Sequence, residues 1–296
     1  MTVRKLESSP ATLPLFVRAG LGAVPGSGKL PFLAGGGGAV PDLELELAGV
    51  EADVRRLAEY AHLCGFALRD ALPATYPHVL AFPLHMSLLT DPSFPFPAIG
   101  LVHIANRIQQ ARPIGVKEPL TLRVRATQPE RHPKGRAFRL LTEARVGDEL
   151  VWSGESTNLR RGGGGEGAAA PRERASDAAE PRELRDEAEW SLPGDLGRRY
   201  AGVAGDRNPI HLYGVTAKAF GFPRQIAHGM WTKARCLAQL DSRVPEAFTV
   251  DVAFKRPILL PSKVRFASVE VDGETAFAVR AAREGTPHLE GSIAAG

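Results

Sequence analysis

The chain has 296 residues, of which 44% are hydrophobic and 24% charged, a composition typical of a soluble globular protein. Its net charge is only +4, and its arginines are spread along the chain without forming one basic face, which argues against nucleic-acid binding. No apolar stretch reaches the roughly 20 residues that cross a bilayer, so we expect no membrane span and a cytoplasmic protein.

The first half of the chain predicts a leader followed by a folded repeat. Residues 1–41 contain many glycines and prolines and predict a leader and loop more than a packed element. Residues 42–160 predict a first repeat, whose central helix near Leu84–Thr90 should be short because three prolines follow it closely. The strands predicted in this repeat cover residues 101–110, 120–126, 136–145 and 149–159.

A low-complexity linker, residues 161–183, separates the first repeat from a second one at residues 184–296. The second repeat begins with predicted helices at 197–203 and 215–220. A longer helix at 229–241 is apolar on most sides, as buried helices are. Four predicted strands follow, at residues 248–255, 263–271, 275–283 and 288–294. One buried helix followed by an antiparallel sheet indicates an α+β fold.

Three short matches indicate that the two repeats arose by duplication. The segments beginning at Arg55, Phe82 and Arg112 align with those beginning at Arg198, Gln225 and Arg256, at separations of 143 or 144 residues (198 − 55, 256 − 112). Chance agreement among common residues is the alternative. The same register places His62 or Leu63 opposite Asp206, and Ala67 or Leu68 opposite His211. The first repeat therefore lacks the Asp and His pair, and we expect one active site per chain.

The turn after residue 205 carries a pattern typical of acid-base chemistry. Asp206 and His211 lie five positions apart, across Asn208 and Pro209 and directly after a glycine. Proline fixes one backbone angle and glycine permits unusual ones, so both side chains can face one point and share a water molecule. The four residues around Asn208 also favour a plain turn, which is the structural alternative.

A later His228-Gly229-Met230 completes a family signature. With the Gly-Asp-x-Asn-Pro-x-His segment, it resembles the MaoC-like (R)-specific enoyl-CoA hydratases and 3-hydroxyacyl-thioester dehydratases. The resemblance implies a double hotdog, in which each repeat is an antiparallel sheet wrapped around a central helix. It also implies reversible dehydration of (R)-3-hydroxyacyl thioesters to trans-2-enoyl thioesters in fatty-acid metabolism. It is strongest to the double-hotdog dehydratases of bacterial fatty-acid elongation, over residues 42–296.

The catalytic roles follow from the chemistry of elimination. Asp206 and His211 would share the proton transfers, while the backbone N–H of Gly229, at a helix start, would stabilise negative charge on the thioester oxygen. Close packing of helix on sheet is the alternative for Gly229. Asn208 would orient the dyad or a loop carbonyl. His228 would orient the turn or be an ordinary core histidine.

The resemblance implies an acyl-CoA or acyl carrier protein thioester as partner and substrate, with no metal and no redox cofactor. No His, Cys, Asp or Glu cluster has zinc-ligand spacing, and Cys64 and Cys236 predict two reduced, packed thiols. The chain alone leaves a homodimer open. A short helix in the first repeat would leave space for a long acyl chain.

Two alternative functions remain. A hotdog acyl thioesterase commonly carries a carboxylate on its central helix, and residues 229–240 contain no Asp or Glu. A non-catalytic acyl-thioester-binding partner subunit would not need the Asp206 and His211 pair.

Overall fold

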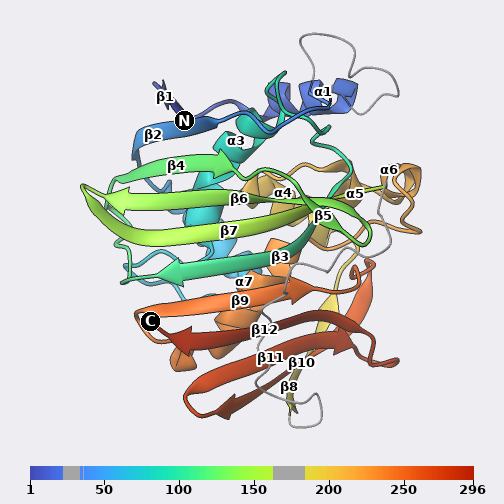
Figure 1. Cartoon of the computed structure of the whole chain (residues 1–296). Coiled ribbons are helices and arrows are strands. Elements are labelled where there is room, and N and C mark those ends of the chain that lie inside the picture. Colours follow the sequence, from blue (N-terminus) through green and yellow to red (C-terminus); the bar gives the residue numbers. More distant parts are fainter. Residues whose placement is uncertain (23–33, 36, 163–183) are drawn as a thin grey trace. The chain divides into compact units, whose positions relative to one another are not determined.

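The computed structural model describes residues 1–22, 34–35, 37–162 and 184–296 (Figure 1). Most of the predicted linker, from residue 163 to 183, lies outside the described residues. The chain divides into two compact units: unit 1 is Met1–Ala52, Pro77–Ile104 and Lys117–Arg172, and unit 2 is Asp53–Tyr76, Ala105–Val116 and Glu173–Gly296. Each unit takes up separate segments, whereas the sequence predicted consecutive repeats at 42–160 and 184–296. The repeat boundaries stay a prediction.

Unit 1 is built on a twisted sheet with the strand order β1-β2-β4-β6-β7. Strand β1 runs parallel to β2, and the other pairs are antiparallel. A short strand, β5, pairs with β6. The predicted strands of the first repeat are confirmed within one or two residues. The bounds are β1 Thr2–Leu6, β2 Leu43–Val50, β4 Leu120–Ala126, β5 Glu130–His132, β6 Gly135–Val146 and β7 Glu149–Arg161.

The central helix of unit 1, α3 (Tyr76–Leu89), is longer than expected. It has 14 residues, whereas the corresponding helix of unit 2, α7 (Gly229–Leu240), has 12, so the prediction of a short helix is wrong. The prolines downstream only set the end of α3, which extends toward the N-terminus. Pro77 is tolerated in the first turn, where the missing N–H has no helical acceptor, and the helix also accommodates Pro83 in its interior. Nε2 of His85 lies 2.8 Å from Thr142 Oγ1 on β6, which fixes α3 on its sheet.

Residues 1–41 contain more packed structure than the sequence predicted. Besides β1, they form helix α1 (Thr12–Gly22), and the prediction of a leader and loop is wrong for these segments. Ala19 on α1 is buried against Met86 of α3 and Ile99. Residues 12–22 are therefore a helix that packs on the core of unit 1.

Unit 2 has an antiparallel sheet with the order β3-β9-β12-β11-β10-β8, to which β3 contributes its residues from 105 onward. Four of these strands match the predicted runs at 248–294 closely. Strand β8 was missed because its charged residues alternate with few apolar ones: only Trp190 and Leu192 are buried. The bounds are β3 Leu101–Gln110, β8 Arg185–Leu192, β9 Phe248–Phe254, β10 Ser262–Val271, β11 Glu274–Ala281 and β12 Pro287–Ala295.

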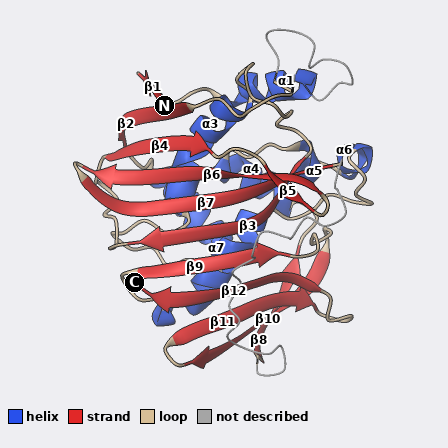
Figure 2. Ribbon diagram, viewed as in Figure 1, coloured by secondary structure: helices blue, strands red, loops and turns tan. Residues whose placement is uncertain are grey.

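Helix α7 lies on one face of the unit 2 strands (Figure 2). The predicted helices of the second repeat are confirmed. Cys64 and Cys236 are both buried and free, as predicted, and burial raises the pKa of Cys64 to about 12. The other helices among the described residues of this unit are α2 Val54–Cys64, α4 Leu196–Ala204, α5 Pro209–Leu212, α6 Gly214–Ala219 and the 3-10 turn η2 Asp241–Arg243.

A buried lysine joins α7 to two strands of unit 2. Lys233 is fully buried, and its ammonium donates to Asn106 Oδ1 at 2.6 Å, to Asn106 O at 3.1 Å and to Val250 O at 3.2 Å. Burial lowers the pKa of Lys233 well below its usual range, and Asp251 acts against this shift. Three acceptors match the three N–H donors of an ammonium group, so the geometry is that of a charged lysine fully satisfied by hydrogen bonds.

The described residues thus combine helices with mainly antiparallel sheets, and the α+β class is confirmed. None of the described helices is long and apolar enough to cross a membrane.

Candidate active site

Asp206 lies directly after the C-terminal end of helix α4. The helix ends at Gly205, whose φ of 82° is left-handed and whose N–H donates to Ala201 O at 3.0 Å. Glycine adopts this conformation without the penalty that a Cβ imposes, so the chain can turn sharply out of the helix. Asp206 follows at once, and its Oδ1 accepts the N–H of Asn208 at 3.0 Å. This hydrogen bond fixes the carboxylate over the start of the next turn.

The short helix α5 then positions His211. Asn208 is its N-cap residue, with Oδ1 accepting the Ile210 N–H at 3.4 Å, and Pro209 occupies the first helical position. These two residues set the direction of the turn that carries His211. The side chain of Asn208 therefore caps a helix, while its backbone N–H orients Asp206.

Gly197 allows α4 to approach this turn closely. A Cβ at Gly197 would lie 2.0 Å from the carbonyl oxygen of His211 and 3.0 Å from its carbon. Only glycine fits at this contact between two backbone segments. The sequence placed Gly197 at the start of a helix but gave no signal of its contact with the segment that holds His211.

The imidazole of His211 is held in one tautomer. Its Nδ1 lies 2.8 Å from Ile226 O, a carbonyl that can only accept, so Nδ1 carries the proton. The other nitrogen, Nε2, therefore has a free lone pair. His211 is only 8% exposed. The side chain is thus a buried, neutral imidazole whose basic nitrogen can accept a proton.

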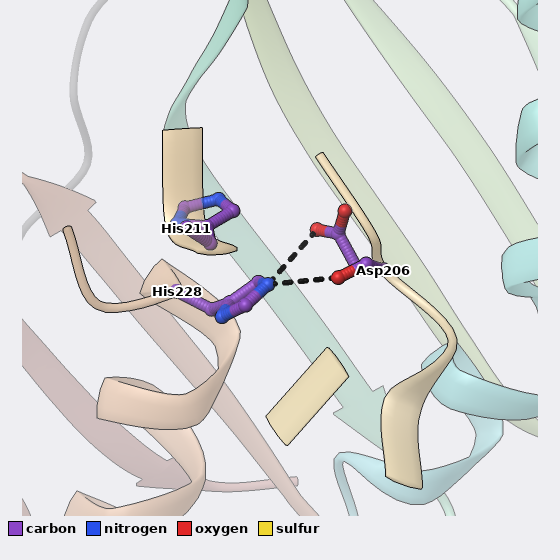
Figure 3. Close-up of side chains that lie close together, drawn as sticks. All are labelled: Asp206, His211 and His228. Carbon is purple, nitrogen blue, oxygen red and sulfur yellow. Dashed lines mark hydrogen bonds and ion pairs between the residues drawn. The ribbon is translucent and has the colours of Figure 1, made fainter. Parts of the chain in front are cut away.

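His228 is part of the same cluster, which sequence reasoning left undecided. Its Nε2 donates to Asp206 O at 3.0 Å and lies 3.8 Å from Asp206 Oδ2 (Figure 3). Its ring stacks on that of His211, with centroids 3.7 Å apart and an interplanar angle of 26°. Within the described part of the chain, its buried Nδ1 has no hydrogen-bond partner. His228 therefore orients both the Asp206 turn and the His211 ring.

Two buried tyrosines support the cluster from unit 2. The ring of Tyr200 on α4 lies 4.8 Å from that of His228 and 6.0 Å from that of Tyr60, measured between centroids. The hydroxyl of Tyr60 is 2.7 Å from Thr75 Oγ1. Burial raises the pKa of both phenols well above their ordinary value, so they are neutral hydrogen-bonding groups. The Tyr200 ring therefore packs against the His228 ring, and Tyr60 packs behind Tyr200.

Burial shifts the pKa of every titratable group in the cluster toward its neutral form. The pKa of Asp206 is raised by desolvation, although His211 and the Asn208 N–H act against this shift. The pKa of His211 is lowered by desolvation, opposed by the Asp206 carboxylate and the Ile226 carbonyl. The pKa of His228 is lowered well below its usual value, by desolvation and by neighbouring His211. A carboxyl with a raised pKa beside a neutral imidazole is a pair suited to acid-base catalysis near neutral pH.

Asp206, His211 and His228 each have one atom that could bind a metal ion, and these three atoms lie within 4.8 Å of one another. Among the described residues, no hydrogen bond joins the carboxylate directly to His211, and this spacing suits a bridging water. The spacing of these three residues along the sequence did not predict that they form one cluster. Nε2 of His228 already donates to a carbonyl, so in this tautomer this nitrogen is not free to bind a metal ion. The absence of a metal stays a prediction.

Gly229 is the first residue of α7, with His228 as the N-cap. Its N–H points out of the first turn, where no helical acceptor exists. A Cβ at Gly229 would lie 2.9 to 3.1 Å from three ring atoms of Phe254 on β9, so close packing also requires a small residue here. The structure supplies the packing reason that the sequence left open, and the oxyanion role remains compatible with it.

The chain is similar in sequence to known dehydratases and hydratases. The sequence profile of the MaoC like domain matches residues 175–291. The chain is 36% identical to 3-hydroxyacyl-thioester dehydratase X of Mycobacterium tuberculosis over 289 residues, covering 97% of this chain and 99% of that protein. It is 27% identical to enoyl-CoA hydratase ChsH3 of the same organism over 217 residues, covering 70% and 72% of the two chains.

Solved structures agree with this similarity. The crystal structure of dehydratase X from M. tuberculosis aligns with a TM-score of 0.75 and 34% identity, covering 85% of this chain and 99% of that one. A M. tuberculosis protein with a double hotdog fold aligns with a TM-score of 0.54 and 15% identity, covering 88% and 98%. The expectation of a double hotdog is thereby confirmed.

Proposed function

The chain belongs to the MaoC-like dehydratase family, and from this premise we propose that it dehydrates (R)-3-hydroxyacyl thioesters reversibly to trans-2-enoyl thioesters. One observation carries the proposal. The buried imidazole of His211, with Nδ1 tied to Ile226 O, has a ring nitrogen within 4.8 Å of a carboxylate oxygen of Asp206. Elimination of water needs such a pair, because one proton must leave carbon and one must join the departing hydroxide.

We assign the first proton transfer to His211. Its Nε2 accepts the proton from C2 of the substrate, the C3–O bond breaks, and the electron pair of the C2–H bond forms the C2–C3 double bond. The departing hydroxide takes up a proton from the dyad and leaves as water. One proton is taken and one is returned, so the site ends in its initial protonation state. Asp206 holds the hydroxyl group and stabilises the transient imidazolium by its negative charge.

Negative charge develops on the thioester oxygen when C2 loses its proton. We assign its stabilisation to the N–H of Gly229, which is fixed at the start of α7 and aided by the helix dipole. Removing one donor of this kind costs about 10²- to 10³-fold in kcat in other enzymes. Asn208 acts indirectly, by capping α5 and by holding the Asp206 carboxylate.

Hydration of a trans-2-enoyl-CoA by the purified chain tests the proposal directly. Loss of the ultraviolet absorbance of the conjugated thioester should be fast in the wild type and nearly absent in Asp206→Asn. No turnover by the wild-type chain alone would instead support a non-catalytic binding subunit. A thiol reagent in the same reaction tests for a thioesterase, which releases free thiol, whereas hydration releases none.

Neither central helix supports the thioesterase alternative. Helix α7 contains no Asp or Glu, and neither does α3. The polar buried groups of α7 are Thr232 and Lys233, and the latter is bound to three acceptors. A carboxylate nucleophile or base is therefore missing from the place where hotdog thioesterases commonly carry one.

We further propose that the substrate is carried by coenzyme A or acyl carrier protein, in the cytoplasm, with no nucleic-acid partner and no metal or redox cofactor. A comparison of matched acyl groups on both carriers decides between them. The argument for long acyl chains rested on a short central helix, and the 14 residues of α3 remove that argument. Light scattering on the purified chain tests whether it forms a homodimer.

A further inference from the structure

Unit 2 contains a cavity that the catalytic cluster does not use. Its volume is about 350 Å³, within the range of sites that bind small molecules. It is lined from strand β8 by Trp190, from α4 by Arg199, and from α7 by Trp231 and Arg235. None of Asp206, His211, His228 and Gly229 is among its lining residues. The cavity is therefore separate from the proposed reaction.

The charged groups of the lining favour an anion. Arg199 and Arg235 face the cavity, and in the described part of the chain the guanidinium of Arg199 makes no hydrogen bond or ion pair. The guanidinium of Arg235 lies 5.2 Å from the centre of the Trp190 ring. Its one hydrogen bond to another described residue is long, 3.5 Å, to Cys64 O. The one lining carboxylate, Glu189, is already paired with Lys263 at 3.5 Å and Arg265 at 3.6 Å.

A buried polar group in the lining lacks a partner. Trp190 is only 7% exposed, and its indole N–H has no acceptor among the described residues. By contrast, the indole N–H of Trp231, also in the lining, donates to Leu63 O at 3.2 Å. A buried N–H without a partner costs free energy, and indole groups usually find an acceptor. A ligand in the cavity would supply one.

We propose that this cavity binds a small anion that carries an apolar or planar body, such as a fatty-acid carboxylate or an adenine nucleotide phosphate. The anionic group lies between Arg199 and Arg235 and accepts the Trp190 N–H, while the apolar body contacts Trp231 and Leu196. Both α4 and α7 line the cavity, and these are the helices that lead into Asp206 and out of His228. A bound anion therefore braces both helices from a place outside the catalytic cluster.

Binding is tested on the full chain by tryptophan fluorescence and calorimetry, with octanoate and adenosine 3′,5′-bisphosphate as probes and octanol as the neutral control. We expect saturable binding of at least one anion and no comparable binding of octanol. Octanoate alone would identify a carboxylate site, and the bisphosphate alone would identify a nucleotide site. Absence of saturable binding of both anions up to millimolar concentration, or equal binding of octanol, overturns the proposal.

Two variants test the contacts. Arg199→Gln should weaken binding about tenfold or more, the order expected for a hydrogen bond to a charged group, while Arg283→Gln, an exposed change of equal charge outside the cavity, should not. Trp190→Phe keeps a six-membered aromatic ring but removes the pyrrole ring with its unpartnered N–H, so it should weaken anion binding measured by calorimetry. Because Trp190 is buried and stacks on Phe266, the variant should also unfold at a lower midpoint, and binding is measured well below that midpoint. Unchanged affinity in either cavity variant contradicts the assigned contacts.

Asp206→Asn separates this proposal from the proposed reaction. The variant should bind the anion as the wild type does, because Asp206 does not line the cavity. Loss of anion binding together with loss of turnover would show that the probe occupies the catalytic cluster, which overturns a separate site. Turnover without anion binding would overturn the cavity proposal and leave the reaction unaffected.

Discussion

Replacing Gly197 with alanine should displace His211 and thereby impair catalysis. The added Cβ would lie 2.0 Å from His211 O, whereas ordinary contacts begin near 3.4 Å, so the two backbone segments must separate by about 1.4 Å (3.4 − 2.0). No flexible side chain can absorb this change, because both sides of the contact are backbone. A misplacement of about 1 Å in an active site can cost about 10²-fold in rate. We therefore expect Gly197→Ala to lower kcat at least about 10²-fold.

The substitution should lower the free energy of unfolding without unfolding the protein. Overpacking of this kind costs about 1–3 kcal/mol, which a domain of ordinary stability survives. Hydration of an enoyl-CoA should be measured below the unfolding midpoint of the variant, established by circular dichroism. A folded variant with low kcat and intact secondary structure is the expected result.

Gly202→Ala is the matched control on the same helix. A Cβ there meets nothing within 4 Å. Alanine should stabilise α4 by about 0.5–1 kcal/mol, through reduced backbone freedom in the unfolded chain, and should leave kcat unchanged. Wild-type kcat in Gly197→Ala, or equal losses in both variants, would refute the view that this contact positions His211.

Four further predictions concern the same cluster. Asp206→Asn and His211→Ala should each lower kcat/KM by about 10²- to 10⁴-fold, and the double variant should lose little more, since the two act as a unit; fully additive losses would argue against a dyad. The acidic limb of the kcat/KM profile should lie below pH 6.5, because His211 must be neutral and burial lowers its pKa. In Asp206→Asn this limb should move to still lower pH, since the carboxylate that raises the His211 pKa is lost; a shift upward would contradict the assignment. His228→Leu should cost about 1–3 kcal/mol in urea unfolding, because Asp206 O loses its buried donor. The pKa of His228 is depressed below the 6.5 of the unfolded chain, so wild-type stability should be full above pH 6.5 and fall as pH drops toward the folded value, and the variant should lose part of this slope. Gly229→Ala should lower kcat, and the double variant Gly229→Ala/Phe254→Leu tests the reason. Recovery of kcat in the double variant would show that Gly229 serves packing against the Phe254 ring, whereas continued loss of kcat supports the oxyanion role.

The sequence predicted the parts of the fold that local patterns encode. The strands and helices of residues 197–294 were found because their apolar residues recur with clear periods. Strand β8 was missed because its alternation is mostly between charged residues, and α1 was missed because glycines and prolines surround it. The length of α3 was wrong because prolines were taken to limit the helix, although those after residue 90 only follow its end.

In the candidate site, too, the sequence predicted what lies within one short segment and missed the contacts between distant segments. Asp206, Asn208 and His211 lie within one short segment, so sequence spacing could bring them together. The contacts of His228 with Asp206 O and with the His211 ring join segments 17 to 22 residues apart (228 − 211, 228 − 206), and no local pattern reports such contacts. Gly197 was missed for the same reason.

The three hydrogen bonds of Lys233 also fix how far α7 can move along its own axis. A slide of one residue, about 1.5 Å, would stretch the bonds to both Asn106 and Val250 at once and leave a buried cation unsatisfied. Lys233 lies one helical turn after Gly229, so its hydrogen bonds also fix the position of the Gly229 N–H along the helix axis. Because α7 cannot slide along its axis, other elements of the protein must make room for acyl chains of different length.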